Sequence, residues 1–385
     1  MQENSKGFIN VFVKEIKEII ASPYRLGLVT WIPLLGLFLL ISIFANGVVR
    51  DLPIAVVDRD NSLLSRTITA QLDASSTLKV QNSSLVDAKK HLRQGKVYAL
   101  VIISNNFEKE VRLGHQPALE AMINTQYILI GKIVSAALSG TVMQSAGRID
   151  FVKNLVKDKR ASSAMAAVAP IGLHLMPLFN EYKNYFPFLV GAMLPALWQV
   201  FIVIVSIISM GVMFKSGEEH RWLEAADGSL ATMLLGKMTP YTLIFLLHGL
   251  FFFSFVYIIL PWSFEGSYLF MILVQFITVI AYQSVALLLF VVGFDYARGL
   301  SLGAVYTAPA FAFMGVTFPT SNMPLFGQIW HDLLPISHYQ YIQIAQANYG
   351  ASIVDMIPTL GAIALFLLPL PLVYYRFKKA LELSS

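Results

Sequence analysis

Histidine is the side chain best suited to acid–base or metal chemistry near neutral pH, and this sequence contains seven histidines and no cysteine. The histidines are dispersed, and no pair of them stands at metal-ligand spacing beside a carboxylate, as in H-E-x-x-H. Neither a G-x-S-x-G nucleophile motif nor a G-x-x-x-x-G-K-[ST] phosphate-binding loop occurs. We therefore expect no metal site, no catalytic residue and no cofactor bound by this chain, which should not hydrolyse nucleotide alone.

One acidic cluster, DRDNS at 58–62, could supply oxygen ligands to calcium. Calcium takes about six to eight oxygens, and no glycine turn or distal glutamate completes a binding loop here. We favour a structural role, in which Asp60, Asn61 and Ser62 form a turn and cap the following helix.

Four polar residues lie within long apolar segments and are candidates for lining a substrate path: Gln199, His248, Gln275 and Gln283. An ionisable group inside a membrane span is a functional candidate by default. The simpler explanation is interhelical hydrogen bonding, which we favour for a neutral His248. For the three glutamines both explanations fit equally well.

The composition explains why these segments matter, because 56% of the 385 residues are hydrophobic and only 13% are charged. A soluble domain spends about a quarter of its residues on charge. Six apolar windows between charges are long enough for a span of about 20 residues, namely 25–50, 183–215, 237–265, 265–295, 298–332 and 355–376. A further stretch, 161–180, is weakly hydrophobic and broken by two prolines, so we expect the end of a soluble helix and an extended segment there. The net charge of +5 is scattered and does not indicate nucleic-acid binding.

Lysine and arginine in short loops predict the orientation of the spans. With the N-terminus inside, the short outside stretches 261–267 and 318–356 contain no Lys or Arg. Both termini are then inside, and the long insert after the first span is outside. The first apolar core, 26–45, exceeds the roughly 7–15 residues of a signal peptide, and no cleavage site follows it, so we expect an uncleaved anchor.

The outer insert alternates strand and helix patterns, which predicts a small α/β domain. The expected strands are 54–57, 77–80, 97–103 and 119–124, and the expected helices are 61–72, 84–93, 105–113 and 126–158. The fold class is therefore an α-helical polytopic membrane protein with six transmembrane helices and an inserted α/β domain.

Three further segments have distinctive patterns. The N-terminal segment is amphipathic, with apolar residues at helical spacing from Phe8 to Ile20 and with Lys14, Glu15, Lys17 and Glu18 on the other face. It is expected on the inner membrane surface or in a partner's groove. The inside loop 214–237 contains a charged stretch, 218–224, that is either a short docking helix with Trp222 and Leu223 on one side or an ordinary solvated loop. The GxxxG at Gly299 and Gly303 is a weak helix-packing signal.

The outside segment 317–350 is apolar and aromatic but contains three prolines. It is too hydrophobic for a free loop and too broken for a span, so we expect a re-entrant hairpin buried in protein. Its aromatic residues are expected at the level of the membrane interface: Trp330, Tyr339, Tyr341 and Tyr349.

With these motifs in order, the sequence resembles the membrane subunit of bacterial type-2 ABC exporters, in the subclass with a large periplasmic insert. The resemblance covers nearly the whole chain. It rests on Lys14-Glu15 and Ser22-Pro23 in the N-terminal helix, Val57-Asp58 with Asn61-Ser62 at the start of the insert, Glu218-Glu219 and Trp222-Leu223-Glu224 in the coupling segment, Gly236-Lys237 and Pro240-Tyr241 at the third span, and Phe318-Pro319, Met323-Pro324 and Pro335 in the hairpin. The sequence departs from the family pattern where Trp222 replaces a common Gly-Thr, and where His220 and Arg221 replace a longer basic run.

The resemblance implies a layout in the bacterial inner membrane. A cytoplasmic interface helix (1–24) is followed by span one (25–46), a periplasmic α/β domain (47–184), spans two to six (185–377) and a cytoplasmic tail (378–385). It also implies coupling residues that contact the ATPase: Glu218, Glu219, Arg221, Trp222, Leu223, Glu224, Gly236 and Lys237.

The resemblance also implies partners and a substrate class. Two permease subunits, identical or related, would form a pore among membrane lipids, and a separate ABC ATPase would carry ATP and Mg. A periplasmic adaptor is a further expected partner. The family exports hydrophobic or amphipathic molecules such as drugs, lipids or glycolipids.

Two other classes are open alternatives. One is a membrane-anchored receptor or phage-infection-type protein whose periplasmic domain binds a ligand. The other is an intramembrane lipid-modifying enzyme, which ranks last because the spans hold too few clustered Asp, His or Arg residues.

Overall fold

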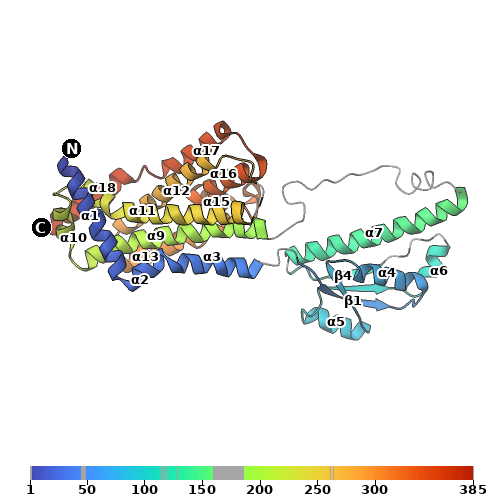
Figure 1. Cartoon of the computed structure of the whole chain (residues 1–385). Helices are drawn as coiled ribbons and strands as arrows, with labels where there is room; N and C mark the ends of the chain where they lie inside the picture. Colours follow the sequence, from blue (N-terminus) through green and yellow to red (C-terminus); the bar gives the residue numbers. More distant parts are fainter. Residues whose placement is uncertain are drawn as a thin grey trace. The chain divides into compact units, whose positions relative to one another are not determined.

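The computed structural model describes residues 2–44, 49–113, 115, 117, 119–126, 128–158, 186–260, 262 and 264–384. The chain divides into two compact units, one of residues 48–176 and one of residues 1–47 and 177–385 (Figure 1). We call them the α/β unit and the membrane unit. The expected extended segment 161–180 lies outside the described residues.

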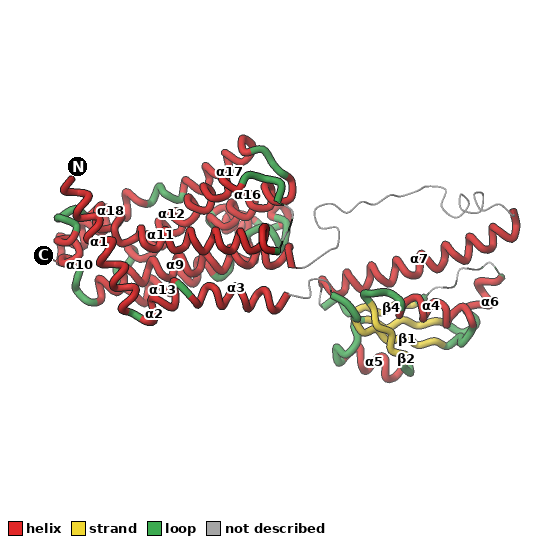
Figure 2. Tube along the Cα trace, viewed as in Figure 1, coloured by secondary structure: helices red, strands yellow, loops and turns green. Residues whose placement is uncertain are grey.

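The α/β unit contains a four-stranded sheet in the order β2-β1-β3-β4. β1 pairs in parallel with β2 and β3, and β4 is antiparallel to β3. The strands are β1 (Leu52–Asp58), β2 (Leu78–Asn82), β3 (Ala99–Ile103) and β4 (Glu120–Ile123), and the helices are α4 (Leu63–Asp73), α5 (Leu85–Arg93), α6 (Phe107–Arg112) and α7 (Ile128–Asp158) (Figure 2). Every predicted strand and helix of this unit is present, with ends shifted by a few residues.

Helices cover both faces of this sheet, which explains why the central strand β1 is apolar along its length. Ile54 and Val56 pack on one face with Leu72 of α4 and Val134 of α7. Ala55 and Val57 pack on the other face, with Ala88 of α5.

The DRDNS segment is a turn, as we favoured. The Asp58 carboxylate accepts hydrogen bonds from the backbone N–H groups of Asp60 (2.9 Å) and Asn61 (3.0 Å). Ser62 caps α4 by accepting from the N–H of Ser65 at 3.1 Å. Asp60 accepts from the N–H of Glu108 at 3.0 Å, which ties the turn to α6. The Ser62 hydroxyl and the Glu108 N–H lower the pKa of Asp60 below its usual 3.8, because both stabilise the carboxylate.

The membrane unit is helical in its described part. Its elements before the central bundle are α1 (Gln2–Ala21), α2 (Pro23–Val29), α3 (Trp31–Phe44) and the π-helix η1 (Phe186–Val190). The bundle continues with α9 (Gly191–Lys215), α10 (Glu219–Ala225), α11 (Leu230–Ser254), η2 (Phe255–Ile259), α12 (Tyr268–Val291) and α13 (Tyr296–Thr307). The last elements are α14 (Ala310–Phe313), η3 (Thr320–Asn322), α15 (Leu325–Asp332), α16 (Pro335–Tyr349), α17 (Ile353–Leu365) and α18 (Leu370–Ser384).

Within the described residues, four helical segments are long and apolar enough to cross a membrane: 188–215, 230–259, 268–291 and 353–383. The pair α2–α3 makes a fifth if its 43° bend is counted as one broken span. The first predicted span is therefore broken near Thr30 rather than one straight helix.

The fifth predicted window, 298–332, holds no single helix long enough to span, so the fifth of the six expected transmembrane helices is not seen as one continuous helix. α13 has 12 residues, and at about 1.5 Å per residue it rises roughly 18 Å, less than a hydrocarbon core of about 30 Å. The chain breaks at Pro309, continues as the four-residue α14 and then turns into η3 and α15.

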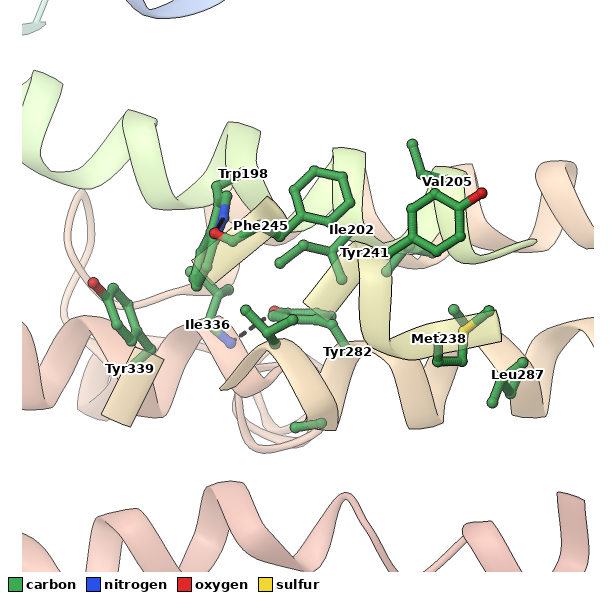
Figure 3. Close-up of a cluster of buried hydrophobic side chains, with 14 of the residues drawn as sticks. Trp198, Ile202, Val205, Met238, Tyr241, Phe245, Tyr282, Leu287, Ile336 and Tyr339 are labelled. Carbon is green, nitrogen blue, oxygen red and sulfur yellow. Dashed lines mark hydrogen bonds between the residues drawn. The ribbon is translucent and has the colours of Figure 1, made fainter. Parts of the chain in front are cut away.

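The core of the bundle lies between α9, α11, α12 and α16. Trp198 and Ile202 of α9 pack with Phe245 of α11 and Tyr282 of α12 (Figure 3). The Trp198 indole N–H donates to the carbonyl of Phe245 at 2.9 Å. Gly299 and Gly303 let α13 approach α9 closely, because a Cβ at either position would lie about 3 Å from Ile207, so this GxxxG is a packing site as predicted.

Candidate functional site

A fully buried carboxylate, Glu15 of α1, lies at the centre of a polar cluster in the membrane unit. It accepts hydrogen bonds from the Lys237 ammonium (2.5 Å), the Tyr241 hydroxyl (2.5 Å) and the Ser209 hydroxyl (2.9 Å). The Arg25 guanidinium lies 3.7 Å from the same carboxylate. We call these five residues the Glu15 cluster; their side chains come from α1, α2, α9 and α11.

The pairing explains how charges can be buried here. Removing an ion from water costs several kcal/mol, and this cost is offset only by close partners and full hydrogen bonding. Lys237 is 1% exposed and Arg25 7% exposed, and both face the one carboxylate. The cluster therefore holds α1 against the bundle through charged groups, each of which would be too costly to bury without its partner.

Glycine permits the close approach of α1 to α11. A Cβ at Gly236 would lie 2.7 Å from the Cβ of Val11 and 3.3 Å from the carbonyl of Phe8. This position precedes Lys237, so the close backbone contact and the ion pair are adjacent. The GK motif is thus a helix-contact site.

Trp222 connects the short helix α10 to this cluster. Its side chain is buried, and the Lys237 ammonium lies 3.6 Å from the ring centroid. The Lys14 ammonium lies 4.0 Å from the same ring. Both distances are within the roughly 6 Å over which a cation is attracted to an aromatic face, so α10, α1 and α11 meet around one indole.

The structure brings together some of the predicted coupling residues and leaves others on the surface. Trp222, Gly236 and Lys237 meet α1, whereas Arg221 and Glu224 are exposed. Arg221 pairs with Glu218 at 3.1 Å. The remaining two, Glu219 and Leu223, are partly buried. Of the two alternatives left open for this stretch, the structure shows the short helix, which spans Glu219–Ala225.

The central member of the cluster was misplaced by sequence reasoning. The pattern put Glu15 on the polar face of α1, but the structure buries it. A signal was present, because Val11, Glu15 and Ile19 recur every four residues and therefore share one helix face, and all three are buried. Ser209 and Arg25 gave no comparable signal.

The three glutamines of the expected path join helices. Gln199 of α9 accepts from the Tyr282 hydroxyl of α12. Gln275 of α12 donates to the carbonyl of Gly249 at 3.2 Å, and Gln283 donates to the carbonyl of Met238 at 3.2 Å. Each glutamine thus makes an interhelical hydrogen bond, while a role in a substrate path stays a prediction.

His248 is largely buried in α11. Its ring stacks on Phe252 at 5.9 Å and lies 5.8 Å from Phe245. Its Nδ1 makes no hydrogen bond within the described residues, so the hydrogen bond we expected is not seen at that nitrogen.

The predicted outer hairpin contains η3, α15 and α16. Pro319, Pro324 and Pro335 stand at or just before the starts of these helices, where proline's missing N–H costs little. Met323 is buried and Phe318 is exposed. Tyr339 corrects our expectation of interfacial aromatics, because it is 3% exposed and its hydroxyl accepts from Gln275 at 3.3 Å.

These features define a class: a multi-pass membrane protein whose bundle carries a buried ion cluster and whose chain includes a small α/β domain. Residues 26–370 match the profile of the ABC-2 family transporter proteins, and the chain belongs to this family. The matched region is a membrane permease domain, a transport subunit without an ATPase domain, and the family implies an ABC ATPase as partner. The resemblance seen in the sequence is confirmed at this level. No curated protein matches the chain.

Proposed function

We propose that this chain is the permease subunit of an ATP-driven exporter of the type-2 class, which moves a hydrophobic or amphipathic molecule outward across the bacterial inner membrane. The substrate is a drug, lipid or glycolipid. A separate ABC ATPase binds ATP and Mg, and a second permease subunit, identical or related, completes the pore.

The observation that carries this proposal is the attachment of α10 to the Glu15 cluster. α10 presents Arg221 and Glu224 to solvent and buries Trp222 against two ammonium groups. Packed interiors transmit displacement because they have few voids. A displacement of α10 by the ATPase therefore moves α1 and α11 together, and through Ser209 also α9.

The ends of the membrane unit support an orientation. The N-terminus, the C-terminus and α10 lie at one end of the bundle, and α15 and α16 lie toward the other (Figure 1). We assign the first end to the cytoplasm, as the distribution of Lys and Arg predicts. In this arrangement α13 and α14 form a discontinuous fifth crossing of six, and residues 317–350 form a re-entrant hairpin at the outer end. The α/β unit is then periplasmic, where it can meet an adaptor.

Charge reversal on α10 tests the proposal. Glu224→Lys and Glu219→Lys should reduce ATP-driven export in vesicles about tenfold, the loss that follows from about 1.4 kcal/mol of docking energy. Glu224 is exposed, so its replacement should leave folding intact. The same reversal at Glu382, whose side chain is 65% exposed in α18, is the control and should leave export unchanged. Full export by both α10 variants would refute the docking assignment.

Membership of the family favours transport over the receptor and the lipid-modifying enzyme. Copurification separates the first two classes directly. A transporter should retain a P-loop ATPase after mild solubilisation, and a receptor should not.

A further inference from the structure

A pocket of about 480 Å³ lies in the membrane unit between the hairpin, α16 and α17. Ligand pockets in proteins range from about 300 to 1,000 Å³. The pocket shares no residue with the Glu15 cluster, and its helices α15, α16 and α17 lie away from α10 along the bundle (Figure 1). Part of its wall is apolar, with Met314, Val316, Ile344 and Met356.

Two buried residues on α16 each contribute to the pocket wall a polar atom that has no hydrogen-bond partner in the described part of the chain. Ser337 and Gln340 line the pocket and are each 1% exposed. Neither Ser337 Oγ nor Gln340 Oε1 makes a hydrogen bond within the described part of the chain. A buried polar atom left unpaired costs about 1–3 kcal/mol, so such atoms beside a cavity are candidates to pair with a molecule that enters it. The Gln340 amide is fixed, because its Nε2 donates to the carbonyl of Ala192 at 3.1 Å, which makes Oε1 an acceptor.

The two histidines of the pocket also present acceptors. His331 Nδ1 lies 2.8 Å from the carbonyl of Phe313, so this nitrogen donates, and Nε2 of the neutral ring accepts. His338 Nε2 lies 3.1 Å from the carbonyl of Asp332, which leaves Nδ1 to accept in the same way. Among the residues that the structure describes, the lining includes the Asp332 carboxylate and no Lys or Arg.

We propose that this pocket binds an amphipathic molecule whose head group is uncharged and rich in hydroxyl groups, as in a sugar. The hydroxyls donate to Ser337, Gln340 and the histidines, and the apolar part lies along the Met314–Ile344 wall. An anionic head group is disfavoured, because a carboxylate and no cation lines the site. The site deepens the proposed function, on which it rests, by giving the exported molecule a binding place at the end opposite α10.

Photolabelling tests the site without the ATPase. The purified full-length chain in lipid nanodiscs is irradiated with dodecyl-β-maltoside that carries a diazirine in its alkyl chain. We expect labelled peptides from α16 and α17. Unlabelled dodecyl-β-maltoside should suppress the labelling, whereas dodecyl phosphate and dodecyltrimethylammonium, which have the same chain, should not.

A matched pair of variants assigns the hydrogen bond. Ser337→Ala should lower labelling about fivefold, the effect of one hydrogen bond. Ser284→Ala removes another buried, unpartnered hydroxyl that does not line the pocket, and should label normally. Equal labelling of Ser337→Ala, or equal competition by dodecyl phosphate or by dodecyltrimethylammonium, would overturn the proposal. ATP-driven export that persists without maltoside labelling would overturn this site alone, whereas labelling in a chain without export would overturn only the transport function.

Discussion

Two carboxylates, one in each unit, show how differently this chain uses a negative charge. Glu15 is fully buried and is held by side chains from three other helices. Asp60 is partly exposed and is held by Ser62 nearby in the chain and by one backbone N–H of α6. The side chains that donate hydrogen bonds to Glu15 are 194 to 226 positions away from it in the sequence. Asp60 fixes a local turn, so the replacement of Asp60 should destabilise a much smaller part of the molecule than the replacement of Glu15.

The largest expected effect is the loss of Glu15. Glu15→Ala leaves the buried Lys237 ammonium without its carboxylate partner, and leaves the buried Arg25 guanidinium with the half-exposed Glu18 carboxylate 3.9 Å away. Breaking a buried pair in this way costs about 3–5 kcal/mol. We expect a large fall in the thermal stability of the detergent-solubilised chain, together with loss of export.

A double variant distinguishes charge imbalance from lost packing. Replacing a buried pair by apolar residues of similar volume is often neutral, so Glu15→Met with Lys237→Met should regain most of the stability. If the double variant is as unstable as Glu15→Ala, Glu15 stabilises the fold by packing and the contrast with Asp60 fails.

A smaller effect is expected where α1 touches α11. Gly236→Ala places a Cβ 2.7 Å from that of Val11, and overpacking of this kind costs about 1–3 kcal/mol. Thermal unfolding should detect the loss. Val11→Gly added to Gly236→Ala removes the Cβ in conflict and should restore part of the stability, while Val11→Gly alone should destabilise. No rescue would mean that the backbone carbonyl of Phe8, 3.3 Å from the new Cβ, is the obstacle.

The same comparison separates what the sequence could predict from what it could not. The turn around Asp60 follows from local rules, because Asp, Asn and Ser cap helices through groups two or three residues away. The strand at 97–103 and the long helix that became α7 were likewise legible from composition and period.

Burial of Glu15 could not be derived in this way. A charged residue on an amphipathic helix is normally solvated, and its partner Lys237 comes from a distant helix. The resemblance predicted Trp222 and Lys237 as separate coupling residues. Only the fold shows that the Lys237 ammonium lies over the Trp222 indole. The shortness of α13 was not predicted, because a count of apolar residues measures length between charges and not continuity of the helix.

The smallest expected effect concerns pH and the α/β unit. The Asp60 carboxylate stabilises the folded α/β unit, because the Ser62 hydroxyl and the Glu108 N–H lower the pKa of this group in the folded state. A lowered pKa gives stability that is fully present above the usual value of 3.8 and is lost as the pH falls through the folded value. Hydrogen exchange of the full chain should therefore show faster opening of the β1–α4 turn below about pH 4.

Asp60→Asn supplies the control for this pH effect, because the amide oxygen can still accept from the Glu108 N–H but does not titrate. The variant should exchange at a rate that changes less with pH in the same range, and the stability of the membrane unit should not change. Faster exchange throughout both units at acid pH would mean that the turn is coupled to the Glu15 cluster. In that case the two carboxylates would act together, and the division into a local and a long-range charge would be wrong.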